Sequence, residues 1–189
     1  MTSELILKAE KLKLNGEHLD AIGILEDIVK SDLNCIAAFE ELGDNFLSLR
    51  QFDKALRALK YALRLDPISA NAHYLLGFTL SCLNQFDKSI AELEIADKIE
   101  PNHPEIVRCL GWSIFNAGKK KQGLVILSRA NAIAPNDPLI MCDLGVCLLN
   151  DMQFEAATNM FEKILAIEPG NHQALECLKA CSHFKEKHA

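Results

Sequence analysis

The chain has 189 residues, of which 49% are hydrophobic and 24% are charged, a composition typical of a folded globular protein. Its formal net charge of −6 disfavours a general nucleic-acid binder, because such proteins need a basic surface to displace counterions. No hydrophobic run approaches the length of a membrane span, and acids and lysines interrupt the first residues where a signal peptide would be apolar. We therefore expect neither nucleic-acid nor membrane partners.

Cysteine usage indicates the compartment. The chain has seven cysteines, an odd number, and none forms a CxxC pair. A secreted disulfide framework would look different, so we expect a reducing, cytoplasmic environment in which free cysteines pack as small hydrophobes.

A repeat of 34 residues organises the chain, as shown by the equal spacing of Pro67, Pro101, Pro135 and Pro169. With each proline at position 32, glycine recurs at position 8, and mostly apolar residues recur at 4, 7, 11, 20, 24 and 27. This three-and-four spacing predicts two amphipathic helices in each unit. Proline ends the second helix because it has no backbone N–H. A glycine inside a helix costs about 1 kcal/mol relative to alanine, so its recurrence predicts a close helix contact.

In chain order, the predicted units are residues 2–35, 36–69, 70–103, 104–137 and 138–171. The first is degenerate, because Lys8 and Ala9 replace the Leu-Gly pair of positions 7 and 8, and Leu33 replaces proline. Residues 172–189 begin one more helix of increasing polarity, which we interpret as a solvating cap. We expect an all-α chain of about eleven helices that forms a single domain, residues 1–189.

This pattern resembles the tetratricopeptide repeat family over residues 2–171. The resemblance implies a right-handed α-solenoid of antiparallel helix pairs, in which the first helix of each pair lines a concave groove. It also implies a protein–protein interaction module, such as an adaptor, a scaffold or a chaperone. Unit 104–137 departs most from the family pattern, with Lys120 and Gly123 at positions 17 and 20, so its second helix is predicted to be looser or shifted by a residue.

The resemblance also predicts a binding site, because positions 2, 5, 9, 12 and 13 of the first helices face the concave side in this family. The groove residues predicted in this way are Asn71, Tyr74, Phe78, Arg108, Trp112, Phe115, Asn116, Val146, Leu149 and Asn150. Their aromatic and aliphatic members would form an apolar stripe for an extended peptide or an amphipathic helix with apolar anchors. The alternative is that neighbouring helices of the chain itself bury some of these side chains.

Two charged groups offer further sites. The segment GKKKQG, residues 118–123, is the only basic cluster that we recognise, and it is either a solvated turn or a docking point for an acidic segment. An acidic group on the first helices either is solvated or steers a basic peptide towards the groove. Its members are Glu10, Glu40, Glu41 and Asp44.

Several histidine and cysteine residues are candidate metal ligands. Cys177 and Cys181 lie one helical turn apart, with His183 nearby, but no second ligand pair has metal spacing, so we predict an apolar edge of the capping helix. His73 occupies a packing position, which favours a hydrogen-bonded core histidine over a ligand.

The chain has no Gly-rich phosphate loop, no GxSxG and no HExxH motif. We therefore predict that it is not an enzyme and that it needs no cofactor or metal. Two function classes stay open: a peptide-binding interaction module, and an architectural protein that self-associates through a face of the solenoid.

Overall fold

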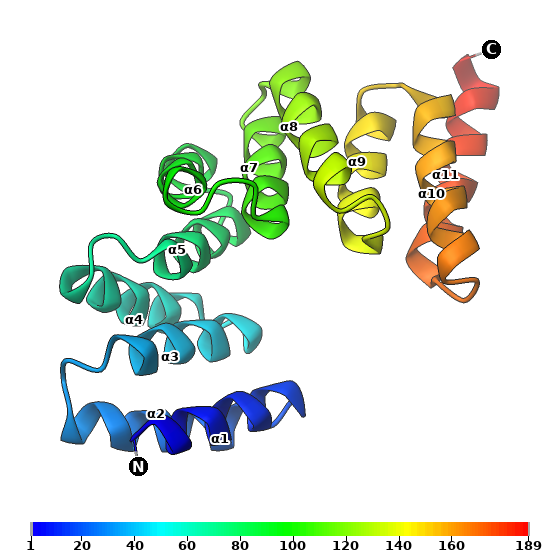
Figure 1. Ribbon diagram of the computed structural model, residues 1–189. Helices are drawn as coiled ribbons and strands as arrows, with labels where there is room; N and C mark the ends of the chain where they lie inside the picture. The colour runs from blue at the N-terminus through cyan, green and yellow to red at the C-terminus, as the bar shows by residue number, and fades with distance from the viewer. Residues whose placement is uncertain (1, 189) are drawn as a thin grey trace. The chain divides into compact units, whose positions relative to one another are not determined.

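The structure is a computed structural model that describes residues 2–188 and the side chains as far as residue 185. Within residues 2–188 all regular structure is helical, as predicted, and there are eleven helices and no strand (Figure 1). The helices are α1 (Thr2–Leu14), α2 (His18–Ser31), α3 (Ile36–Ser48), α4 (Phe52–Leu65), α5 (Ala70–Cys82), α6 (Phe86–Ile99), α7 (Pro104–Asn116), α8 (Lys120–Ile133), α9 (Pro138–Asn150), α10 (Phe154–Ile167) and α11 (His172–His188). None of the described helices is both long and apolar enough to span a bilayer.

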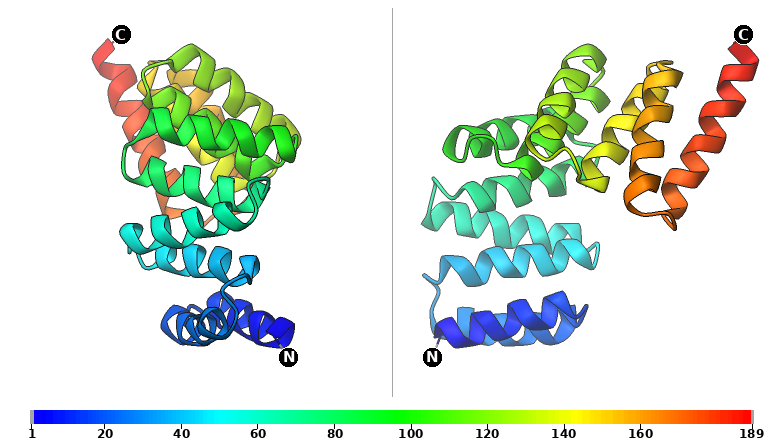
Figure 2. Two further views of the ribbon diagram at one scale, coloured as in Figure 1. Left: turned by 90° about the vertical axis from the view of Figure 1, so that its left-hand side faces the viewer. Right: turned by 45° about the vertical axis from the view of Figure 1, so that its right-hand side comes forward.

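The helices group into two compact units, the first ending at Pro101 and the second beginning at Asn102. The first unit holds α1 to α6, which form three helical hairpins, and the second holds α7 to α11. Within each unit, helices that follow one another in the chain pack side by side (Figures 1 and 2). The boundary between the units falls in the turn between the third and fourth predicted repeats.

The second helices of the repeats confirm the predicted register. Helices α2, α4, α6, α8 and α10 each have 14 residues, and each ends two residues before position 32 of its repeat. Position 24 of every repeat, including the degenerate first one, is a large apolar residue with no solvent exposure. These residues are Leu25, Leu59, Leu93, Leu127 and Phe161.

The glycine at position 8 is explained by close contact between the two helices of each hairpin. A Cβ atom placed on Gly77 would lie 2.6 Å from Cγ of Leu93. A Cβ on Gly111 would lie 2.8 Å from the backbone nitrogen of Leu127. Atoms this close overlap, so a larger residue at position 8 would push the second helix away from the first.

Of the two alternatives predicted for α8, looser packing or a shift by one residue, the shift was wrong. The helix begins at Lys120, 34 residues after the start of α6 at Phe86, and it has the same length. Gly123 is the reason that the register is kept: a Cβ at this position would lie 2.6 Å from the backbone nitrogen of Phe115. The missing side chain lets α8 approach the main chain of α7 closely.

A left-handed residue between the two helices recurs at position 15 of every repeat. Gly16 has a φ of 80° and Gly118 one of 89°. Asn84, Arg50 and Met152 adopt the same conformation, with φ values of 57°, 56° and 60°. This conformation is strained for residues with a Cβ, whereas glycine adopts it freely.

We expect Met152→Gly to stabilise the chain. The side chain is 65% exposed, so little packing is lost. The left-handed conformation costs a residue with a Cβ roughly 1–2 kcal/mol, and glycine avoids this cost. Because glycine has greater conformational freedom in the unfolded chain, part of this stabilisation is offset, which leaves a net gain of about 0.5 kcal/mol. The measurement is the urea midpoint, with Asp151→Gly as the control, because Asp151 has a φ of −97° and gains nothing from glycine. A lower midpoint for Met152→Gly would show that backbone strain is not the deciding effect.

Candidate functional site

A surface pocket in the first unit lies where first helices of successive repeats meet. Its volume is about 450 Å³, and we name it the α3–α5 pocket. It is lined by Asp44, Leu47, Ser48, Arg50, Phe52, Asn71, Tyr74, Leu75, Phe78 and Cys82. Three of these residues, Asn71, Tyr74 and Phe78, are the members of the predicted groove that belong to this unit.

In the opposite wall of the pocket, only Asp44 was among the predicted residues, as a member of the acidic group. Asp44, Leu47 and Ser48 occupy positions 9, 12 and 13 of the repeat before, which are the positions used to predict the groove in later repeats. The same register would therefore have found them. Arg50 and Phe52 extend this wall beyond α3, and the guanidinium carbon of Arg50 lies 5.9 Å from the centre of the Phe52 ring.

Aromatic rings give the α3–α5 pocket its apolar surface. Tyr74 and Phe78 lie one turn apart on α5, with their ring centres 6.4 Å apart and their planes only 6° from parallel. Both side chains are half-buried, so each keeps an accessible part. Cys82 lies at the end of this row, where burial raises the pKa of its thiol although Arg50 opposes the shift. The thiol is therefore protonated at neutral pH and acts as an apolar contact.

The acidic side of the pocket is largely occupied by partners within the chain. Nζ of Lys13 lies 2.8 Å from Oε2 of Glu41 and 2.7 Å from Oδ2 of Asp44. Burial raises the pKa of Glu41, although Lys13 opposes this shift. Glu40 accepts hydrogen bonds from the Ser69 hydroxyl at 2.5 Å and from the Asn71 amide at 2.9 Å. These pairings hold α1, α3 and α5 together and leave less free charge for a basic peptide than the sequence suggested.

The predicted groove residues of the second unit have different surroundings from one another. Arg108 is bound to two carboxylates, with Nη2 2.7 Å from Oε2 of Glu105 and Nη1 2.5 Å from Oδ2 of Asp143. Phe115 is only 6% exposed and packs in a core cluster with Leu127, so it cannot contribute an open surface.

The other predicted residues of this unit are at least partly accessible. Trp112 is half-buried against the cluster that contains Phe115. Val146 and Leu149 of α9 are half-buried as well. Asn116 and Asn150 are exposed; the Asn116 amide donates to the Trp112 carbonyl at 2.9 Å, and the Asn150 carbonyl accepts a hydrogen bond from Lys120 at 3.0 Å.

Among the candidate ligands, His73, Cys177 and Cys181 have packing roles, whereas His183 is exposed. His73 is 8% exposed; its Nδ1 lies 2.7 Å from Oε2 of Glu92 and its Nε2 lies 3.1 Å from the Pro67 carbonyl oxygen, as expected for a hydrogen-bonded core histidine. Cys181 is buried in the core of the second unit, and the His183 ring lies against Phe184. Among the described residues, no three His, Cys, Asp or Glu side chains gather as a metal site would require.

The prediction that the segment 118–123 is the only basic cluster was wrong. Helix α4 carries four exposed cations at intervals of three, three and four residues, which places them on neighbouring turns. These residues are Lys54, Arg57, Lys60 and Arg64. The segment 118–123 itself turns at Gly118 and forms the start of α8 at Lys120.

Comparison with known proteins identifies the repeat. A model described as tetratricopeptide repeat matches residues 46–110. No curated protein matches the chain by sequence.

Solved structures match almost the whole chain. TTC0263, a thermophilic TPR protein of Thermus thermophilus, is 17% identical with a TM-score of 0.83, over 95% of this chain and 98% of that one. PilW, a widely conserved type IV pilus biogenesis factor, is 20% identical with a TM-score of 0.83, over 98% and 91%. YrrB, a TPR protein with an unusual peptide-binding site, is 22% identical with a TM-score of 0.69, over 93% and 90%. At these identities the likeness shows the fold alone.

Proposed function

We propose that this chain, which is a tetratricopeptide repeat protein, is an interaction module that binds a peptide or a helix with apolar anchors against the first helices of its repeats. The observation that carries the proposal is the α3–α5 pocket. Its two half-buried aromatic rings, Tyr74 and Phe78, lie at repeat positions that the sequence had marked for a groove. Aromatic side chains in a concave site are the usual centres of binding energy.

The polar groups around the rings suit a peptide main chain. Asn71 and Ser48 can donate to carbonyl groups or accept from amide groups, and Arg50 supplies a cation at the rim. These groups suit an extended segment or a helix that inserts one or two apolar side chains.

In the second unit Trp112, Val146 and Leu149 are half-buried at groove positions and offer a separate candidate surface, and Asn116 and Asn150 of this unit are exposed. Phe115 is left out, because it lies in the core. We also place the protein in the cytoplasm, a proposal supported by seven cysteines that are all free. A scaffold or chaperone-like role fits the same surface.

Selection from a random peptide library tests the proposal. We expect the wild-type chain to enrich peptides with apolar residues at helical or alternating spacing. The double variant Tyr74→Ala/Phe78→Ala should bind the selected peptides about tenfold to a hundredfold more weakly, because each truncated hot-spot ring typically costs more than about 1 kcal/mol. The matched control is Ile68→Ser, which removes an apolar side chain that is 74% exposed and outside the pocket.

Two further measurements distinguish the outcomes. Trp112 fluorescence should shift to the blue on binding if the peptide reaches the second unit, and it should stay constant if the peptide occupies only the α3–α5 pocket. Light scattering of the free chain separates peptide binding from self-association. A chain that forms oligomers through the residues of the α3–α5 pocket, or that selects no peptide dependent on Tyr74 and Phe78, would contradict the proposal.

A further inference from the structure

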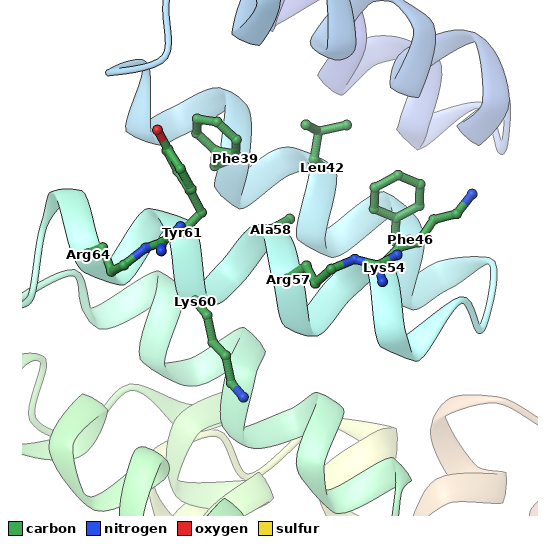
Figure 3. Close-up of a pocket in the computed structure, with 9 residues that line it drawn as sticks. All are labelled: Phe39, Leu42, Phe46, Lys54, Arg57, Ala58, Lys60, Tyr61 and Arg64. Atoms are coloured by element: carbon green, nitrogen blue, oxygen red, sulfur yellow. The ribbon is translucent and has the colours of Figure 1, made fainter.

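A second pocket lies in the first unit, between α3 and α4, with a volume of about 900 Å³ (Figure 3). We name it the α3–α4 pocket. Its apolar lining comes from Phe39, Leu42 and Phe46 of α3 and from Ala58 and Tyr61 of α4. It shares no lining residue with the α3–α5 pocket. Whatever binds here therefore meets a different surface from the one proposed above.

The rim of the α3–α4 pocket is basic. The lining residues Lys54, Arg57, Lys60 and Arg64 are all exposed, and Asp53 is the only acid in α4. In Figure 3, Lys54, Arg57 and Arg64 lie on the same side as the aromatic rings, whereas Lys60 points away from them. A chain with 26 acidic and 20 basic residues thus concentrates positive charge at one pocket.

Two cations of the rim, Lys54 and Arg64, have aromatic neighbours in place of carboxylates. Nζ of Lys54 lies 5.2 Å from the centre of the Phe46 ring, and the guanidinium carbon of Arg64 lies 4.7 Å from the centre of the Tyr61 ring. Within residues 2–185, no carboxylate forms an ion pair with any of the four rim cations. Their charge is therefore available to a ligand, and the rings hold the flexible side chains beside the pocket.

We propose that the α3–α4 pocket binds an acidic segment of a partner protein that inserts one aromatic or leucine side chain and places carboxylates on both sides of it. The apolar lining accepts the inserted side chain, and Lys54, Arg57 and Arg64 pair with the flanking carboxylates. Charge complementarity of this kind selects the partner and accelerates its association.

The geometry favours this partner over a single-stranded nucleic acid. Stacking of bases needs open ring faces. Here Phe39 is 9% exposed and lies 4.2 Å, centre to centre, from the Tyr61 ring, while Phe46 is 7% exposed with Lys54 beside it. The rings therefore form the wall of a pocket for one side chain and offer no platform for consecutive bases.

Fluorescence anisotropy with defined probes tests the proposal. The probe is a short fluorescein-labelled peptide with a central Leu-Phe pair flanked on each side by glutamates. One matched peptide has glutamines in place of the glutamates, another has Ser-Ser in place of Leu-Phe, and labelled oligothymidylate represents nucleic acid. We expect the acidic anchor peptide to bind the wild-type chain, more weakly at raised salt, and both matched peptides to bind at least about tenfold more weakly.

Charge reversal at the rim identifies the site. Lys54→Glu/Arg57→Glu should weaken binding of the acidic anchor peptide by about tenfold or more, because two attractive contacts become repulsive. These side chains are exposed, so the circular dichroism spectrum and melting temperature should stay close to wild type. The matched control is Lys119→Glu/Lys121→Glu, which makes the same change of charge in the second unit and should leave binding intact.

Several outcomes would reject the proposal. The acidic anchor peptide could fail to bind the wild-type chain, or the two charge-reversal variants could bind it equally well. Oligothymidylate binding that is lost on reversal of Lys54 and Arg57 would identify a nucleic-acid site, and a dimer lost in the same variant would identify a second copy of the chain. Loss of binding in Tyr74→Ala/Phe78→Ala would show that the probe binds in the α3–α5 pocket. The experiment therefore distinguishes a failure of the proposal for the α3–α4 pocket from a failure of the proposal for the α3–α5 pocket.

Discussion

Gly111→Leu is expected to destabilise the chain by about 3 kcal/mol or more, at or beyond the upper end of the usual cost of overpacking. A Cβ at this position would lie 2.8 Å from Cγ of Leu127 and equally close to the backbone nitrogen of the same residue. The leucine side chain could rotate, but the backbone nitrogen moves only if α8 moves. Because Leu127 is fully buried, that displacement would disturb the centre of its hairpin.

The measurement is chemical denaturation followed by circular dichroism, and Gly23→Leu is the matched control. Gly23 is also a helical glycine, but no atom lies within 4 Å of the Cβ that would be added there. The control should therefore be neutral or slightly stabilising, because leucine is a better helix former than glycine. Equal effects of the two substitutions would mean that helix propensity, and not the close contact of α7 with α8, determines the cost.

The repeat of 34 residues was sufficient to predict the helices, because each hairpin depends on the same local contacts. Position 24 is fully buried even in the degenerate first repeat, where Leu25 keeps its place although the Leu-Gly pair is missing. The shift expected for α8 was wrong for a physical reason. Gly123 was counted as a departure from a pattern, whereas its missing Cβ is what allows the close approach to Phe115.

The candidate site was only partly predictable. The repeat position of a residue indicates the side of the helix on which its side chain lies, but not which residues surround that side chain. Tyr74 and Phe78 line a pocket at the expected positions, whereas Phe115, at another groove position, is drawn into the core of the second unit. Phe115 lies at position 12, whereas Tyr74 and Phe78 lie at positions 5 and 9, and the position-12 residues of the two preceding repeats, Leu47 and Ser81, are buried as well.

The basic rim of α4 was missed for another reason. A search for consecutive lysines finds residues 118–123, but Lys54, Arg57 and Arg64 are separated in sequence and come together only on the helix surface. Helical spacing applied to charge, as it was applied to hydrophobicity, would have revealed them. That their cations lack carboxylate partners within residues 2–185 could be known only from the structure.

Arg108→Ala is expected to destabilise the second unit by about 2–3 kcal/mol at neutral pH. The side chains of Arg108 and Asp143 are only 13% and 24% exposed, and their nearest atoms are 2.5 Å apart. Removal of the guanidinium leaves the Asp143 carboxylate in a largely buried place without its partner. The cost is set below that of a fully buried pair, because some solvent reaches Asp143.

The loss should depend on pH in a defined direction. Burial raises the pKa of Asp143 above its ordinary value, and the charge and hydrogen bond of Arg108 oppose that shift. Without Arg108 the pKa in the folded chain rises further above that in the unfolded chain. When a carboxyl group has a higher pKa in the folded chain than in the unfolded chain, its contribution to stability is complete at pH values below the pKa of the unfolded chain. That contribution is lost as the pH rises through the pKa of the folded chain. The stability gap between Arg108→Ala and the wild type should therefore be small near pH 4, close to the ordinary pKa of aspartate, and larger at pH 7.

Urea denaturation at both pH values measures this gap, and two further variants assign it. Asp143→Asn in the Arg108→Ala background should recover part of the stability at pH 7, since an uncharged amide is less costly to bury than an unpaired carboxylate. Lys30→Ala breaks an ion pair whose side chains are 70% and 79% exposed, and it should have a negligible effect. Two results together would contradict this expectation: a stability gap of Arg108→Ala that is the same at both pH values, and no recovery with Asp143→Asn. The contribution of Arg108 to stability would then come from the packing of its aliphatic chain. Its guanidinium group would be free to bind a ligand in the groove, as predicted from the sequence.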